Sequence, residues 1–64
     1  MWVKLMTVQN AYVAEMWRGL FYAEALAVRI VPVTGSGNAS ELGPHDIYVP
    51  WGKLHVAQEI IRKI

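Results

Sequence analysis

The hydrophobic and polar positions follow two different periods along the chain, one typical of strands and one typical of helices. Residues 2–8, WVKLMTV, are rich in apolar and β-branched types, which favour a strand. Asn10 comes directly after it and is a good helix N-cap, because its side-chain oxygen can accept a hydrogen bond from a free N–H of the first turn. From Ala11 to Ala25 only Gly19 disfavours a helix, so the pattern predicts a helix over 11–25.

This first predicted helix has an apolar arc on the helical wheel, formed by Val13, Met16, Trp17, Leu20 and Ala23. The opposite arc carries Glu15, Arg18 and Tyr22. We expect the apolar arc to pack against a sheet, with Trp17 in the core.

A second strand is predicted over residues 26–33, LAVRIVPV, with Val28 and Ile30 facing inward and Arg29 outward. Pro32 marks its end or an edge position, since proline donates no hydrogen bond to a neighbouring strand. Residues 34–45, TGSGNASELGPH, are rich in glycine and polar types and predict a loop.

A short third strand follows over residues 46–49, with Ile47 and Val49 on one face and Tyr48 on the other. Residues 52–64 then predict a second amphipathic helix. Its apolar arc holds Leu54, Val56, Ala57, Ile60, Ile61 and Ile64, and its polar arc holds His55, Gln58, Glu59 and Arg62.

The order strand, helix, strand, strand, helix predicts one domain over residues 1–64, an α+β two-layer sandwich with both helices on one sheet face. A right-handed crossover through the first helix makes the first two strands parallel, and the third inserts antiparallel between them, which gives the sheet order 1-3-2. This is a ferredoxin-like half-fold without a last strand. The first strand therefore has a free edge, which is a template for another chain.

The two faces of this predicted sheet have different surroundings, because the helices cover only one of them. Toward the helices we expect Val3, Leu5, Val28, Ile30, Ile47 and Val49, or the alternate residues of the first strand if its register shifts by one. We expect the bare face, together with the residue after Pro50, to present an apolar interface made of Trp2, Met6, Val8, Val31, Tyr48 and Trp51. The sequence therefore predicts a homodimer closed by the free edge, the bare face or both.

Composition strengthens this expectation and removes other classes of protein. Hydrophobic residues make up 55% of the chain and charged residues 17%, against about 25% charged in ordinary domains. A net charge of +1 indicates no basic stripe for nucleic acid, and charges interrupt every apolar run before it could span a membrane. No cysteine is present to form a disulfide or a thiolate metal site. Without the pattern of a signal peptide, we expect a cytoplasmic bacterial protein.

Two strings, NAYVAEMWRGLFYAEAL and DIYVPWGKLHVAQEII, resemble a small bacterial family of unknown function named prokaryotic signal transducing protein. The residues that match are Asn10, Ala14, Glu15, Gly19, Leu20, Tyr48, Val49, Pro50 and Ala57. The resemblance covers nearly the whole chain and implies a βαββα fold akin to the nitrogen-regulatory signal proteins, with no established activity.

The chain departs from the family pattern at three places. Ala25 stands where the family usually has a glycine, at a helix C-terminal position that favours positive φ, and Ala27 stands where it has proline. Residues 51–53, Trp-Gly-Lys, replace acidic residues that would suit a helix N-terminus. We therefore expect the first helix to end differently from the family pattern.

Candidate chemistry is sparse. His45, Asp46 and His55 could supply metal ligands, but their spacing favours solvated histidines, and Glu15 is better explained as a surface partner of Arg18 than as a general base. We therefore expect no metal, no cofactor and no enzymatic activity.

Two functions stay open from the sequence. The first is a non-enzymatic interaction or regulatory module that acts as a homo-oligomer and has a protein partner. The alternative is a sensor of a small molecule or anion at the 34–45 loop, where Gly35, Ser36 and Gly37, with Asn38, could form an anion-binding nest beside His45.

Overall fold

The computed structural model describes residues 1–33 and 43–64 and has the predicted element order. The elements are β1 (Trp2–Val8), α1 (Ala11–Ala23), β2 (Arg29–Pro32), β3 (His45–Pro50), a 3-10 turn η1 (Trp51–Lys53) and α2 (Leu54–Lys63). The three strands form one sheet in the order β1-β3-β2. Strand β3 is antiparallel to both neighbours, so β1 and β2 run parallel, as predicted.

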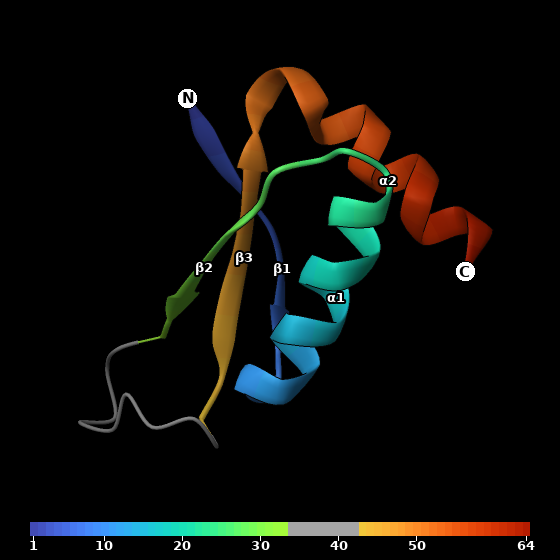
Figure 1. The fold of residues 1–64 in the computed structure, drawn as a ribbon. Helices are drawn as coiled ribbons and strands as arrows, with labels where there is room; N and C mark the ends of the chain where they lie inside the picture. The colour runs from blue at the N-terminus through green and yellow to red at the C-terminus, as the bar shows by residue number, and fades with distance from the viewer. Residues whose placement is uncertain (34–42) are drawn as a thin grey trace.

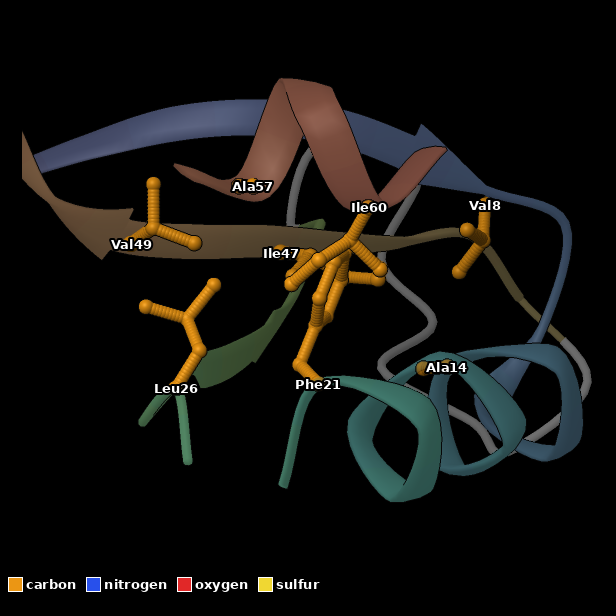
Figure 2. Close-up of a cluster of buried hydrophobic side chains, with 8 residues drawn as sticks. All are labelled: Val8, Ala14, Phe21, Leu26, Ile47, Val49, Ala57 and Ile60. Atoms are coloured by element: carbon orange, nitrogen blue, oxygen red, sulfur yellow. The ribbon is translucent and has the colours of Figure 1, made fainter. Parts of the chain in front are cut away.

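Both helices lie on the same side of the sheet (Figure 1). The core between the two layers holds Val8, Ala14, Phe21, Leu26, Ile47, Val49, Ala57 and Ile60 (Figure 2). Phe21, Ile47 and Val49 are the largest side chains that are fully buried. One side of β3, facing both helices, therefore supplies the floor of the core.

The register of β1 differs from the simple alternation that the sequence predicts. Lys4 pairs with Tyr48 and Met6 pairs with Ile47, so Leu5 is an extra residue that bulges out of the ladder. A one-residue shift moves every later side chain to the opposite face. Met6 and Val8 therefore lie on the helix side, not on the bare face where they were predicted, and Val8 is only 7% exposed.

The buried arc of α1 also differs from the predicted one. Ala14 and Phe21 are fully buried, and Trp17 stacks on Phe21 with ring centroids 5.7 Å apart. Met16 and Leu20, both predicted to face the sheet, lie on the solvent side. In this orientation the Phe21 ring fills the core, and the small Ala14 lets the helix backbone approach the sheet.

The first turn of α1 is capped as predicted. The N–H of Val13 donates to the Asn10 side-chain oxygen at 3.0 Å. This bond satisfies one of the N–H groups that lack a partner within the helix.

The C-terminus of α1 has the hydrogen bonds of a Schellman motif. Ala25 has φ 61°, its N–H donates to Tyr22 O at 2.9 Å, and the N–H of Leu26 donates to Phe21 O at 2.9 Å. We expected a different helix end because alanine replaces the family's glycine here, but Ala25 adopts the positive φ that such a glycine favours. The helix ends at Ala23 and Leu26 belongs to the core, so β2 starts three residues later than predicted.

The predicted apolar and polar arcs of α2 are confirmed except at the C-terminus. Ala57 and Ile60 are buried, while Leu54, Val56 and Ile61 pack against the core. The four residues of the predicted polar arc are exposed. Ile64 follows the helix and is exposed instead of buried.

Candidate interaction surfaces

The bare face of the sheet carries more polar groups than the sequence predicts. Side chains alternate along a strand, so the residues that share the face opposite the core are Trp2, Lys4, Thr7, Arg29, Val31, Asp46, Tyr48 and Pro50. We call this set the bare sheet face. Trp2, Val31 and Tyr48 lie there as predicted, but three charged side chains separate them, so the predicted contiguous apolar patch is absent from the described part of the sheet.

One end of the bare sheet face is aromatic and cationic. Lys4 and Arg29 lie opposite Tyr48 on its two sides, because each is a Cα partner of Tyr48 across the sheet. The Arg29 guanidinium lies 5.3 Å from the centroid of the Trp2 ring, within the range of a cation–π contact. Two cations and two aromatic rings thus meet at this end.

The other end of the bare sheet face is closed by a polar pair. The Thr7 hydroxyl donates to Asp46 Oδ1 at 2.5 Å, and Val31 is the partner of Asp46 on β2. The carboxylate is therefore held between β1 and β3, one row of side chains away from the cations.

The solvent side of α1 is the surface that the sequence interpretation missed. Tyr12, Met16 and Leu20 follow one another at four-residue spacing and are 64%, 57% and 38% exposed. Gly19 and Ala23 lie among them and are exposed as well. We call these five residues the outer face of α1.

The flank of this outer face holds the charges of α1. Arg18 pairs with Glu15 at 2.5 Å, and its guanidinium lies 5.9 Å from the centroid of the Tyr22 ring. The outer face itself carries no charged side chain. A helix that faces water normally has polar residues there, so the four-residue spacing of Tyr12, Met16 and Leu20 was the signal that could have revealed this surface.

The three candidate metal ligands point to different places. His45 is buried on the helix side of β3, not solvated as predicted, and its Nδ1–H donates to Gly43 O at 2.8 Å. Asp46 faces the opposite side of the sheet, and His55 is exposed on α2. Within residues 1–33 and 43–64, no group of three or more potential ligands is close enough to hold a metal ion.

The predicted nest of Gly35, Ser36, Gly37 and Asn38 lies outside the described residues. Of the predicted ligand-binding set, His45 alone can be placed.

Trp17 was predicted to lie in the core and Trp51 at an interface. Trp17 packs against the core, as expected. Trp51 is 63% exposed in η1, and its backbone N–H donates to Met1 O at 2.8 Å, which ties the end of β3 to the start of β1.

The edge of β1 is a further surface. In the described sheet β1 pairs with β3 along one side, and the backbone groups on its other side face outward. The bulge at Leu5 and the charge of Lys4 are features that discourage edge pairing.

The polar side of α2 is another candidate surface. An open hollow runs along it, lined by His55, Gln58, Glu59, Ile61 and Arg62.

Neither helix in the described ranges is long and apolar enough to cross a bilayer.

In comparisons with protein-family models, curated proteins and solved structures, the chain matches none of them. The candidate surfaces therefore depend on the residues and geometry of this chain alone.

Proposed function

We propose that the protein is a non-enzymatic interaction module that works as a homodimer, with the outer face of α1 as the dimer surface. The observation that carries the proposal is the exposure of Tyr12, Met16 and Leu20 on one side of a helix whose other side is already buried. Contiguous apolar surface of this kind on a small domain usually marks a site of association.

A second copy of the chain is the partner that this surface fits. A two-fold dimer needs a surface that carries both the protruding group and the hollow that receives it. On α1 the protruding groups are Met16 and Leu20, and the hollow beside them is the missing side chain of Gly19, an exposed position. Two such helices can therefore approach closely with side chains of one copy over Gly19 of the other.

The charges beside the surface do not oppose this pairing. Glu15 and Arg18 neutralise each other within one chain. The bare sheet face and the edge of β1 stay open in such a dimer, because they belong to the other layer of the sandwich. A regulatory role agrees with the resemblance to the signal transducing family.

Sedimentation equilibrium tests the proposal. We expect the wild-type chain to reach twice its 7.2 kDa mass with rising concentration. Met16→Glu should abolish the dimer, because it places a carboxylate in the apolar contact. Gln58→Glu is the matched control, since it adds the same charge to an exposed position of α2 and should leave the dimer intact.

Gly19→Ala provides a second variant with opposite effects on folding and on association. It should stabilise the monomer by about 1 kcal/mol through helix propensity, while weakening the dimer because it fills the hollow. A wild-type chain that stays monomeric at millimolar concentration, or a Met16→Glu dimer as tight as the wild type, contradicts the proposed dimer surface.

A further inference from the structure

We propose that the bare sheet face binds single-stranded nucleic acid, with two bases stacked on Trp2 and Tyr48 and the adjoining phosphates paired with Lys4 and Arg29. The site uses the layer of the sandwich opposite the outer face of α1. It is therefore independent of the dimer surface.

The spacing of the two rings suits neighbouring bases. Trp2 pairs with Pro50 and Lys4 pairs with Tyr48, so Trp2 and Tyr48 are diagonal neighbours on adjacent strands. Diagonal neighbours lie about 7–8 Å apart at Cα, which lets two splayed bases each meet one ring. Sheets that bind single-stranded RNA use aromatic side chains on adjacent strands in this way.

The cations are placed where the phosphates of such a strand would run. Lys4 and Arg29 lie on either side of Tyr48 and both are exposed. The Arg29 guanidinium lies 5.3 Å from the centroid of the Trp2 ring, so a base that stacks on this face of Trp2 must displace it toward the phosphates. Asp46, in the row of side chains next to Tyr48, accepts the Thr7 hydroxyl, so the acidic group lies one row from the two cations and farther from Trp2.

The net charge of +1 argues against nucleic-acid binding when it is taken as an average over the whole chain. A ligand on the sheet meets one layer, and at its aromatic end Lys4 and Arg29 are cationic. The sites for bases lie on an open sheet, not in an enclosing pocket. A strand that contacts both rings therefore gains more than a single nucleotide, which can stack on one ring only.

Fluorescence anisotropy with a labelled oligouridine of about ten nucleotides, a length within known site sizes, tests this inference. With two phosphate contacts on a single strand, log K should fall against log[salt] with a slope of about −1.4. Lys4→Gln should reduce this slope to about −0.7, because one contact is lost. Unlabelled uridine monophosphate should compete far less well than unlabelled oligouridine.

Aromatic variants separate stacking from folding. Trp2→Ala should weaken binding at least about five-fold, whereas Trp2→Phe should largely retain it, since stacking tolerates any aromatic ring. Tyr22→Ala is the control, because Tyr22 is an exposed aromatic ring on α1, in the other layer. Met16→Glu should bind as the wild type does, even if the proposed dimer is lost, so the two proposals fail independently.

Two results would overturn the inference. One is an anisotropy that does not change up to millimolar protein at about 50 mM salt. The other is binding that Trp2→Ala and Lys4→Gln leave unchanged, which would place the nucleic acid on a different surface.

Discussion

The two helices cover the same sheet but differ in what they show to solvent. Helix α2 buries Ala57 and Ile60 and exposes polar side chains on its opposite side. Helix α1 buries Ala14 and Phe21 and exposes Met16 and other apolar groups. The fold of one chain therefore buries the apolar side of α2, and it leaves apolar side chains of α1 exposed to water.

Surface charge does not account for this difference. Each helix has one ion pair at the same spacing, Glu15–Arg18 at 2.5 Å and Glu59–Arg62 at 3.3 Å. Both pairs are exposed, and such pairs contribute a few tenths of a kcal/mol. The helices differ instead in the apolar residues between the charges.

The ends of the helices differ in the opposite sense. Asn10 caps α1 through its side chain, and the Schellman motif closes its other end. At the N-terminus of α2, Lys53 makes no side-chain hydrogen bond, and its positive charge opposes the helix dipole. The interactions at its two ends therefore stabilise α1 more than α2, whereas burial of its apolar side is more complete for α2. Mutations can measure how much each contributes to the free energy of unfolding.

The largest expected effect is on the core contact of α1. Phe21→Ala should lower the free energy of unfolding by about 3–5 kcal/mol, because it removes the largest buried ring. Ile60→Ala, at the corresponding contact of α2, should cost about 2–4 kcal/mol. Urea unfolding at low protein concentration measures both. A loss below about 1 kcal/mol for Phe21→Ala would refute the orientation of α1.

A smaller effect is expected at the C-terminus of α1. Ala25→Gly should stabilise the chain by about 1 kcal/mol, since alanine is strained at φ 61° and glycine is not. Ala27→Gly is the control, because Ala27 has no positive φ and the added freedom of the unfolded chain should slightly destabilise it. Thermal unfolding monitored by circular dichroism compares the two, and equal shifts would argue against the Schellman motif.

The smallest effect is expected at the N-terminus of α2. Lys53→Ser should stabilise the chain by about 0.3–1 kcal/mol, because it removes a positive charge from the N-terminus of the helix. Lys63→Ser, in the last turn of α2, removes a charge that suits the dipole there and should have the opposite sign. If both variants shift stability in the same direction, the electrostatic account of this helix is wrong.

The parts of the fold that depend on local pattern were predictable from the sequence. The element order, the cap at Asn10 and the buried arc of α2 follow from short-range spacing and turn chemistry. The sheet order follows from the right-handed crossover rule. The end of α1 was not predicted: alanine at position 25 led us to expect a different ending, yet Ala25 has φ 61°.

The errors arose where tertiary packing decides. The bulge at Leu5 adds one residue to β1 and reverses the faces of Met6 and Val8, and no local signal in WVKLMTV reveals it. Helix α1 has apolar residues on two sides, so the sequence was compatible with two orientations of the helix against the sheet. Packing of Phe21 against the sheet selects one of them. Once both errors are corrected, the candidate dimer surface lies on α1 and not on the sheet.

The central claim is that a second copy covers the outer face of α1, and isotope-filtered NMR tests it most directly. A sample that mixes labelled and unlabelled chains reports contacts between subunits alone. The account predicts intermolecular cross-peaks from the Met16 methyl group to side chains of α1 in the other copy. A concentrated sample in which such cross-peaks are absent, or come from α2 instead, would contradict it.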